Sequence, residues 1–251
     1  VQPGRVTTDQ AVVRARHIVV CTHYPIKNVP GFYFTRMNQS RSYVLALENA
    51  ADVGGMWLDA SGDGFSFRNA EGLLLLGGCG HRTGDHPYES SFRALRAAAK
   101  LFYPDAREVA RWSAQDCMPV DGVPFIGRYA RTLPGVYVAT GFGKWGMTNA
   151  MVAAELLTDL ITRKAEYPHA QVFSPQRWSG VSVRFKVGKA PRCTHMGCAL
   201  EWNPDTRTLD CPCHGSRFTR SGKVVSGPAV RDGTWNVYEE GAENTAVGKR
   251  T

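Results

Sequence analysis

Six side chains that bind metals well lie within 22 residues near one end of the chain, between Cys193 and His214. They form two short segments, RCTHMGC at 192–198 and CPCHGSRF at 211–218. Thiolates are soft, charged donors, imidazoles are neutral ones, and a cluster of iron and sulfide binds both. Each segment can direct one sulfur and one nitrogen at a common point. The pattern therefore indicates a metal centre that is built from two loops.

Two other interpretations of these residues are weaker. A structural zinc site also accepts cysteine and histidine, but zinc fingers pair C-x2-4-C with H-x3-5-H, whereas here each segment carries both residue types. A framework made only of disulfides would explain the four cysteines and leave His195 and His214 unexplained. The other three cysteines, Cys21, Cys79 and Cys117, stand among apolar residues and are expected to be small buried side chains.

The two segments resemble the Rieske family, because both halves of its pattern, C-x-H-x-G-C and C-x-C-H-x-S, are present without substitution. The resemblance implies a [2Fe–2S] cluster whose ligands are Cys193 and Cys211 on one iron and His195 and His214 on the other. It also implies a Cys198–Cys213 disulfide between the loops and a small antiparallel β-domain. The segment SGPA at 226–229 is similar to the proline loop that covers the cluster in this family.

The redox chemistry of such a centre follows from its ligands. Two neutral imidazoles in place of two thiolates reduce the negative charge, so the cluster takes up an electron more easily. Rieske potentials lie between about −150 and +300 mV, against about −400 mV for all-cysteine plant-type ferredoxins. Ser216 could donate its hydroxyl to a cluster sulfide, a contact that raises the potential further. The sequence therefore predicts a one-electron acceptor that suits a donor of moderate potential.

A strand, a glycine-rich turn and a helix are expected between residues 134 and 164. The strand is GVYVAT, the turn is GFGKWG at 141–146, and the helix begins near Thr148, which could cap it. The apolar residues at helical spacing are Met151, Val152, Leu156, Leu157 and Leu160. Glycines let a ligand approach the backbone, and the free N–H groups at a helix start attract phosphate or an electron-rich ring oxygen. Taken alone, the pattern is explained at least as well by a turn that binds nothing.

Three further segments, in this order, resemble FAD-dependent oxidoreductases of the D-amino-acid oxidase and glycine oxidase superfamily. They are ARHIVVCTHYP at 15–25, GLLLLGGCGHRTGDH at 72–86 and RWSAQDCMPVDGVPFIGRY at 111–129. More narrowly, the chain is similar to a bacterial branch in which a Rieske domain follows the flavoprotein. This resemblance implies that FAD contacts the glycine-rich turn and one earlier strand end, through Thr22, Gly141, Phe142, Gly143, Lys144, Trp145, Gly146, Met147 and Thr148.

The fold implied by both resemblances is a partial α/β domain of the FAD/NAD(P)-binding type, an antiparallel substrate-domain sheet and a small all-β Rieske domain. Residues 1–31 and 117–168 would form part of the FAD-binding domain, 32–116 the substrate domain and 172–251 the Rieske domain. The superfamily begins with a strand–G-x-G-x-x-G–helix unit for the ADP half of FAD, and this sequence contains no such motif. Either that unit lies outside this sequence, or the chain cannot bind FAD unaided. We also expect the region 181–195 to be shortened, because the strand VSVRFKV runs almost directly into the cysteine motif.

Together the motifs predict a flavin-dependent oxidoreductase. FAD would take a hydride from the carbon next to an amine nitrogen, and the electrons would then pass singly through His195 and His214. The expected partners are a small-molecule amine and an electron-acceptor protein. No catalytic residue is assigned, because this superfamily generally needs no protein base. His23 is expected to be a packed neighbour, and the loop 81–85 to lie either beside the substrate or in solvent.

Two other functions stay open at this stage. The Rieske domain could act as an electron-transfer or redox-sensing module, with no small molecule oxidised by the chain itself. Alternatively, the flavoprotein part could be inactive and structural.

Within the segment 111–117, Gln115 could face the substrate cavity, whereas Trp112 is expected in the core.

Composition excludes some classes of partner. The net charge of +8 comes from lysines and arginines that are scattered along the chain, which argues against nucleic-acid binding. The longest apolar run, GLLLLGG at 72–78, is far shorter than the ~18 residues that a membrane span requires. We expect no membrane span and a cytoplasmic location, which a shielded Rieske disulfide permits.

Overall fold

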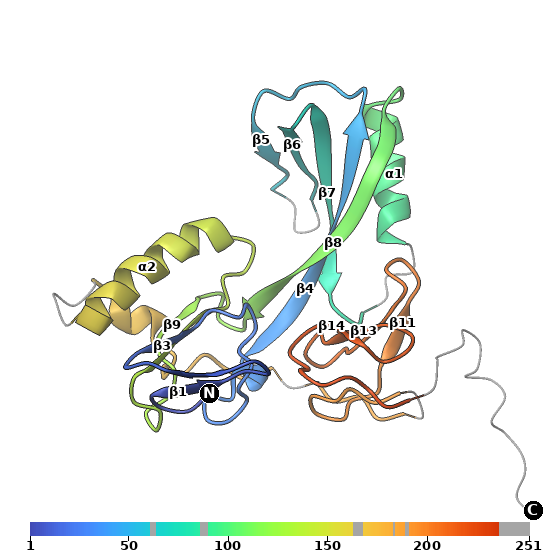
Figure 1. Ribbon diagram of the computed structural model, residues 1–251. Coiled ribbons are helices and arrows are strands. Elements are labelled where there is room, and N and C mark those ends of the chain that lie inside the picture. Colours follow the sequence, from blue (N-terminus) through green and yellow to red (C-terminus); the bar gives the residue numbers. More distant parts are fainter. Residues whose placement is uncertain (61–63, 86–89, 163–167, 183, 189–190, 236–251) are drawn as a thin grey trace, which may run out of the picture.

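The computed structural model of the protein describes residues 1–60, 64–85, 90–162, 168–182, 184–188 and 191–235. In Figure 1 a five-stranded sheet stands at the centre, a smaller sheet with helix α2 lies at the lower left, and the C-terminal strands lie at the lower right. Two long strands, β4 (Met37–Glu48) and β8 (Arg107–Pro119), run down from the central sheet toward the lower parts. These two strands therefore connect the parts of the molecule.

The smaller sheet has the strand order β3–β10–β9. Strands β3 (Ile18–Val20) and β10 (Val136–Thr140) are parallel, and β9 (Phe125–Arg128) is antiparallel to β10. All residues of β10 are buried, as expected for a central strand that is covered on both faces. A hairpin of β1 (Arg5–Thr7) and β2 (Val12–Arg14) precedes this sheet.

Helix α2 (Gly146–Thr162) covers one face of the smaller sheet. The residues buried in this contact are Ala153, Leu156 and Leu157 of the helix and Ile126, Tyr137 and Ala139 of the strands. The helix begins at Gly146 rather than near Thr148, and Met151, which was expected on the apolar face, is 66% exposed. The helical spacing was predicted correctly, but a narrower stripe than expected faces the sheet.

The central sheet is antiparallel throughout, with the order β5–β6–β7–β4–β8. Its other strands are β5 (Met56–Leu58), β6 (Ser66–Ala70) and β7 (Leu73–Arg82). Buried and half-buried residues alternate along most of β4, because successive side chains point to opposite faces of a strand. Helix α1 (Ser91–Phe102) packs against one face of this sheet. The sheet residues in this contact are apolar.

The C-terminal part is a small antiparallel sheet in the order β11–β12–β13–β14. Its strands are β11 (Glu201–Asn203), β12 (Thr208–Asp210), β13 (Arg217–Phe218) and β14 (Val224–Ser226). Its core contains Leu200, Leu209, Phe218 and Ala229 together with four cysteines. Two short 3-10 helices, η1 (Tyr33–Thr35) and η2 (Ala170–Phe173), lie in connections elsewhere in the chain.

The expected fold class is confirmed: a partial α/β unit, an antiparallel sheet and a small all-β part follow one another. The residue limits of the domains stay a prediction, and β8 continues across the expected limit between 116 and 117. The strand predicted at 181–187 is not formed in its described residues, and residue 183 lies outside them. An extended segment needs a neighbouring strand to be stable, and none pairs with the described residues of 181–187.

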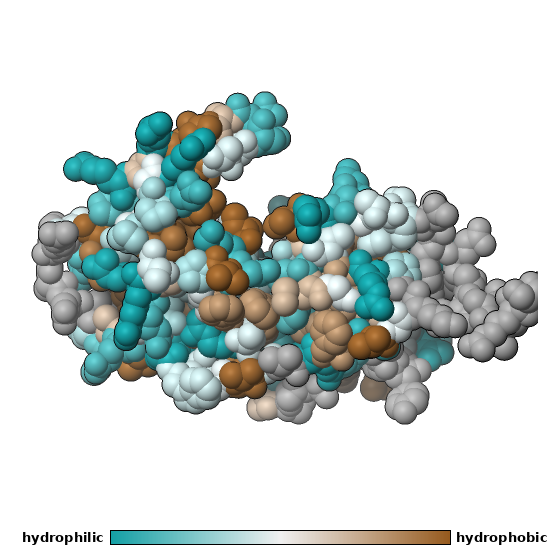
Figure 2. Space-filling view, turned by 90° about the horizontal axis from the view of Figure 1, so that it is seen from below, coloured by the Kyte–Doolittle hydropathy of each residue, from teal (hydrophilic) through white to brown (hydrophobic). Residues whose placement is uncertain are grey.

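No helix in the described ranges has both the length and the apolar character that crossing a membrane demands. Figure 2 shows one face of the molecule, on which hydrophilic and apolar residues are interspersed. Exposed large apolar side chains include Trp57 on β5 (61% exposed) and Trp145 just before α2 (66% exposed).

Candidate functional site

The two cysteine segments form tight loops with the same backbone pattern. In the first loop the N–H of Cys193 donates to the carbonyl of Cys198 (2.9 Å), and the N–H of Gly197 donates back to Cys193 (2.8 Å). In the second loop, between β12 and β13, Cys211 and Gly215 take the corresponding roles at 2.8 and 2.9 Å. Both glycines have positive φ, +77° and +83°, which is the conformation that such a turn requires. The sequence motif is thus a pair of matched ligand loops.

The four predicted cluster ligands come together from these loops. Cys193, Cys211 and His214 are buried, and His195 is half-buried. The two imidazole centroids are 5.0 Å apart, with the rings almost perpendicular. In the described part of the chain, the Nδ1 atoms of both histidines are buried without a hydrogen-bond partner. Because a buried polar atom without a partner is costly, these two nitrogens are suited to bind a group between the loops.

The pKa values of the same side chains favour metal binding. Burial lowers the pKa of His195 to about 4. Burial, with smaller contributions from His195 and Arg82, lowers the pKa of His214 to about 4 as well. A hydrogen bond from the Cys211 thiol lowers the pKa of Cys193 to about 6, while the same contact raises the pKa of Cys211. Neutral imidazoles and a pair of thiols with one easily lost proton are the donor states that metal binding needs.

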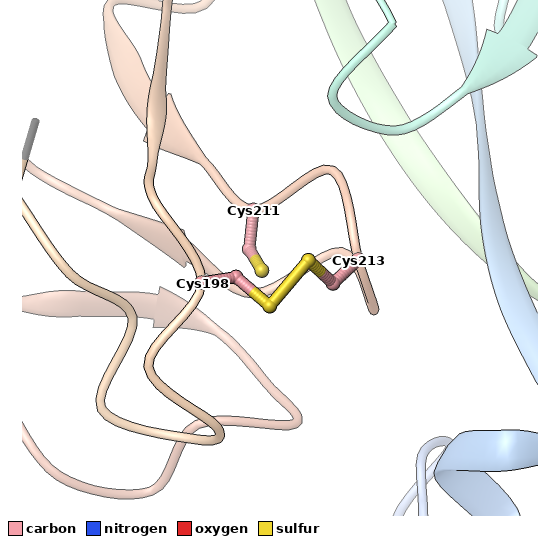
Figure 3. A group of neighbouring side chains, drawn as sticks. All are labelled: Cys198, Cys211 and Cys213. Carbon is pink, nitrogen blue, oxygen red and sulfur yellow. A yellow bond between two sulfur atoms is a disulfide. The ribbon is translucent and has the colours of Figure 1, made fainter. Parts of the chain in front are cut away.

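The remaining two cysteines of the motif, Cys198 and Cys213, are joined by a disulfide between the loops. Figure 3 shows this disulfide beside the Cys211 side chain, and the three sulfur atoms lie within 4.8 Å of one another. Disulfide sulfurs carry no thiolate charge, so this sulfur group is not itself a ligand set. The disulfide instead ties the two ligand loops together, and the predicted donors are the other two cysteines and the two histidines.

Ser216 occupies the position expected for a hydroxyl beside the cluster. The side chain is fully buried, and its Oγ accepts a hydrogen bond from the N–H of Ala229 at 3.0 Å. That contact leaves the hydroxyl hydrogen available, and its hydrogen bond with Cys193 contributes to the low pKa of this thiol. Ser216 is therefore placed to donate a hydrogen bond into the space between the loops.

The second ligand loop is held from strands β4 and β8 of the central sheet. The Gln39 amide donates to the carbonyls of His214 (3.1 Å) and Gly227 (2.9 Å). The Gln115 amide donates to the carbonyl of Gly215 (3.0 Å) and to Gln39 Oε1 (2.5 Å). Gln115 therefore serves the C-terminal part and not the substrate cavity that the sequence suggested. Sequence reasoning missed Gln39, because a glutamine on a strand carries no signal of a partner 175 residues away.

A fully buried ion pair lies next to these amides. Arg41 and Asp210 have no exposed side-chain surface, and Arg41 Nη1 lies 2.6 Å from Asp210 Oδ2. The second Arg41 nitrogen, Nη2, donates to Gln115 Oε1 at 2.5 Å. Asp210 also accepts from Asn203 (3.1 Å) and Thr208 (2.8 Å) and lies 3.5 Å from Arg217 Nε, so the carboxylate is well satisfied. Arg41 Nε, in contrast, is buried without a hydrogen-bond partner among the described residues. The pair joins the central sheet to the C-terminal part through its interior.

The two histidine rings face the N-terminal part of the chain. The Phe34 ring meets His214 and His195 edge-on, with centroid distances of 5.7 and 6.0 Å. His195 Nε2 lies 2.8 Å from the side-chain oxygen of Asn28. Asn28 and Phe34 precede β4, which begins at Met37, and Met37 is close to the glycine-rich turn. The histidine edge of the candidate metal centre is therefore directed toward the part that was expected to bind flavin.

Gly84 marks a close approach of backbones at the same interface. Its φ is +84°, and a Cβ there would lie 2.6 Å from Pro212 N and closer still to Pro212 Cα. We expect Gly84→Ala to lower the free energy of unfolding by about 2–5 kcal/mol, from backbone strain and from overpacking. Gly72→Ala is the matched control, because Gly72 has φ +77° but a Cβ there meets nothing within 4 Å, so about 1–2 kcal/mol is expected. Equal costs in denaturant titrations would contradict this interface.

The glycine-rich turn borders a pocket of about 420 Å³. The lining residues are Cys21, His23, Ala139, Thr140, Gly141, Phe142, Ala150, Ala153, Ala154 and Leu157. Of the predicted flavin contacts, Gly141 and Phe142 line this pocket. The segment 144–148 is exposed at its edge. Thr22 does not line it, and its hydroxyl donates to the carbonyl of Tyr24 at 2.9 Å.

Several expectations about single residues were wrong. Cys21 is exposed rather than buried, because it stands at the open rim of the pocket. Trp112 is 42% exposed rather than packed in the core, since it lies on the face of β8 opposite to α1. The loop 81–85 is buried or half-buried rather than solvated: Arg82 donates to the carbonyl of Cys213 (3.3 Å), and Asp85 pairs with Arg184. These residues hold the C-terminal part and its connecting segment.

A polar group on the other face of the central sheet was missed. Asp116 of β8 is in register with Ser40 of β4, so the two side chains share the face opposite to Gln115. Burial raises the pKa of Asp116, and the charges of Lys144 and His23 partly oppose this rise. A half-buried carboxylate therefore lies near both the glycine-rich turn and the end of β3. The sequence signal for it was the strand alternation, which places Asp116 and Gln115 on opposite faces.

Residues 1–160 match the family described as FAD dependent oxidoreductase (DAO). The chain belongs to this family. Residues 187–239 match the Rieske [2Fe-2S] domain. A protein of Bacillus subtilis (strain 168), YhfW, which is named as a Rieske 2Fe-2S iron-sulfur protein, is 33% identical over 288 residues. That match covers 92% of this chain and 56% of YhfW, so the chain spans about half the length of this relative.

Two other comparisons each cover only a part of this chain. Iron-sulfur subunit 3 of the cytochrome b6-f complex of a Nostoc species is 50% identical over 44 residues, which are 18% of this chain and 25% of the subunit. The solved structure of glycine oxidase from Geobacillus kaustophilus has a TM-score of 0.58 and 20% identity, over 70% of this chain and 49% of that one. The second likeness shows the fold alone. The two matched families have FAD and a [2Fe–2S] cluster as their cofactors.

The residues present fit these cofactors to different extents. Between the ligand loops, two buried unpaired nitrogens and two thiols provide the donor set of a [2Fe–2S] cluster. At the glycine-rich turn, a Cβ on Gly146 would meet nothing within 4 Å, so the start of α2 leaves room for a ligand. Gly141 is a glycine for another reason, because a Cβ there would lie 2.6 Å from Pro119. The turn thus fits a part of FAD beside the pocket.

Proposed function

We propose that this protein oxidises an amine or amino acid with FAD and passes the electrons singly to a Rieske [2Fe–2S] cluster. The observation that carries the proposal is the orientation of the histidine edge. Both imidazoles face Phe34 of the FAD-dependent oxidoreductase part, and His195 also contacts Asn28. An edge placed in this way favours electron entry from a flavin in the same protein, with a separate electron-acceptor protein as the final partner.

The proposed ligands of the cluster are Cys193, Cys211, His195 and His214, with Cys198–Cys213 as the bracing disulfide. The proposed contacts of FAD are Thr22, Gly141, Phe142, Gly143, Lys144, Trp145, Gly146, Met147 and Thr148. When bound, FAD supplies the two-electron acceptor and the cluster supplies a one-electron acceptor. The residues of the chain hold these groups, and Ser216 and Gln39 hold the second ligand loop in place.

An amine substrate is supported by Asp116. Its half-buried carboxylate lies within electrostatic reach of Lys144 and His23, at the edge of the glycine-rich turn. A carboxylate at this position attracts a protonated amine from solution by charge complementarity. The fold of glycine oxidase, which the chain shares, is compatible with this class of substrate.

The function is tested on the intact protein, purified without oxygen and loaded with both cofactors. A panel of amines and amino acids, with glycine, L-proline and aliphatic secondary amines among them, is added under anaerobic conditions. We expect one class to bleach the flavin absorption and to produce the EPR signal of a reduced [2Fe–2S] cluster. A protein whose flavin and cluster both respond to dithionite, but to no member of a broad amine panel, would instead be an electron carrier.

Asp116→Asn provides a separate prediction about stability and pH. Burial raises the pKa of this carboxyl, so its charged form destabilises the folded protein above the unfolded pKa. The variant should therefore be more stable than the parent at pH 7, by about 1 kcal/mol or less because the site is partly solvated. The difference should vanish at acidic pH, where the parent carboxyl is protonated in both states. Thermal unfolding at both pH values measures it, and a variant that is less stable at pH 7 would contradict the assignment.

A further inference from the structure

Asn28 contacts His195, a proposed ligand of the cluster, from outside the Rieske motif. Its side-chain oxygen lies 2.8 Å from His195 Nε2, across 167 residues of sequence. His195 Nδ1 is buried and has no hydrogen-bond partner among the described residues, so this nitrogen is the one that faces a metal. An imidazole that binds metal through Nδ1 carries its proton on Nε2. The N–H of His195 therefore donates to the Asn28 amide oxygen.

The backbone at Asn28 is held in place by its neighbours in the connection between β3 and η1. The carbonyl of Asn28 accepts a hydrogen bond from the N–H of Phe32 at 2.9 Å. The preceding carbonyl, of Lys27, accepts one from the hydroxyl of Tyr129 at 2.5 Å, and Tyr129 is almost fully buried. The amide oxygen is thus presented to His195 by an anchored turn. A fixed acceptor fixes the orientation of the ring that donates to it.

The two histidines are not equivalent in this respect. The His214 ring packs edge-on against Phe34, and its backbone carbonyl accepts from Gln39. Within the part of the chain that the structure describes, His214 Nε2 has no acceptor that corresponds to Asn28. Only one of the two imidazole ligands is therefore polarised by a side chain from the FAD-dependent oxidoreductase part.

We infer that Asn28 is a positioning residue that makes His195 a stronger donor and thereby lowers the electron affinity of the cluster. An acceptor on the distal N–H raises the basicity of a histidine ligand. A more basic ligand stabilises the oxidised iron relative to the reduced iron. The oxidoreductase part would in this way adjust the potential of the acceptor to which it delivers electrons. The inference rests on the proposed cluster ligands, but it does not depend on the identity of the substrate.

The test is a redox titration of the cluster in the intact protein, followed by EPR, for the parent and three variants. Asn28→Leu removes the acceptor at similar volume, and the equilibrium constant for cluster reduction should rise about tenfold, which is 59 mV for a one-electron couple. Asn28→Asp supplies a charged acceptor and should lower that constant by tenfold or more. Asn28→Gln keeps an amide oxygen and should lie between the parent and the leucine variant.

Asn69→Leu is the control, because it removes a half-buried amide that bonds to Val53 and Ala51 of the central sheet part, far from the ligand loops in sequence. It should leave the potential unchanged. If the leucine variant does not retain its cluster, the aspartate and glutamine variants still decide the matter, since both keep an acceptor. Identical potentials in the parent and in every cluster-containing Asn28 variant would overturn the inference. A shifted potential in a protein that oxidises no amine would support it while refuting the proposed substrate.

Discussion

Replacing Arg41 by leucine is expected to lower the free energy of unfolding by about 3–5 kcal/mol, because the buried Asp210 carboxylate then keeps only its longer ion pair with Arg217, at 3.5 Å. Neither Arg41 nor Asp210 has any exposed side-chain surface, and their atoms are 2.6 Å apart. The Arg41 guanidinium also donates to Gln115, which in turn holds the second ligand loop. The substitution should therefore loosen the C-terminal part as well as destabilise the whole protein. Chemical denaturation of the cluster-loaded protein measures the effect.

An exposed ion pair supplies the comparison for Arg41. Arg96 and Glu108 approach to 2.6 Å, but 43% of the Arg96 side chain is exposed. Arg96→Leu should cost about 1 kcal/mol or less, since solvent screens surface pairs. Replacing both Arg41 and Asp210 by apolar residues, as Arg41→Met with Asp210→Leu, should recover only part of the loss, because the buried carboxylate is removed but Arg217 then loses its ion-pair partner at 3.5 Å. A loss of less than 1 kcal/mol for Arg41→Leu alone would show that this interface does not form as described.

Replacing His214 by cysteine is expected to keep a cluster but to lower its reduction potential by a few hundred millivolts. The change converts a neutral ligand to an anionic one, which moves the centre from the range of Rieske clusters toward about −400 mV, the value for all-cysteine plant-type ferredoxins. His214 is 4% exposed, so its surroundings screen the added charge poorly. Electrochemical titration with EPR detection measures the shift.

The control for His214 is a histidine outside the ligand loops. His81 contacts the Tyr43 hydroxyl at 2.9 Å and the carbonyl of Arg82 at 2.9 Å. His81→Cys should alter stability but leave the potential of the cluster where it is in the parent. An unchanged potential in His214→Cys, with the cluster retained, would remove His214 from the ligand set. Zinc instead of iron in the purified protein would reject the cluster itself.

Most of the fold class was predictable because its signals are local. The strand GVYVAT, the glycine-rich turn and the helical spacing of α2 are properties of one short segment, and all were recognisable before the structure. The widths and ends of these elements were less accurate: Met151 is exposed, and no strand forms over the described residues of 181–187. Such details depend on what packs against a segment, and this is not encoded within the segment itself.

The candidate metal centre was the most predictable feature for the same reason. Its six side chains lie within 22 residues, so the spacing of cysteine, histidine and glycine alone describes the two loops. Residues that serve the centre from outside the motif were not predictable. Asn28, Gln39 and Arg41 reach the C-terminal part across 167, 175 and 169 residues of sequence, and polar residues on strands and turns occur in every protein.

The sequence by itself determined the chemistry of this protein: which atoms can bind a cluster, and which family of flavoprotein precedes them. Those features are written in contiguous motifs, whose geometry depends on a few neighbouring dihedral angles. Only the tertiary structure decided which residues of other segments lie beside the candidate sites. It set the histidine edge against Asn28 and Phe34, and it turned Gln115 toward the ligand loop and Asp116 toward the glycine-rich turn. Such choices depend on how distant strands and loops pack, because burial and hydrogen bonding across the interface determine which face of each strand is covered.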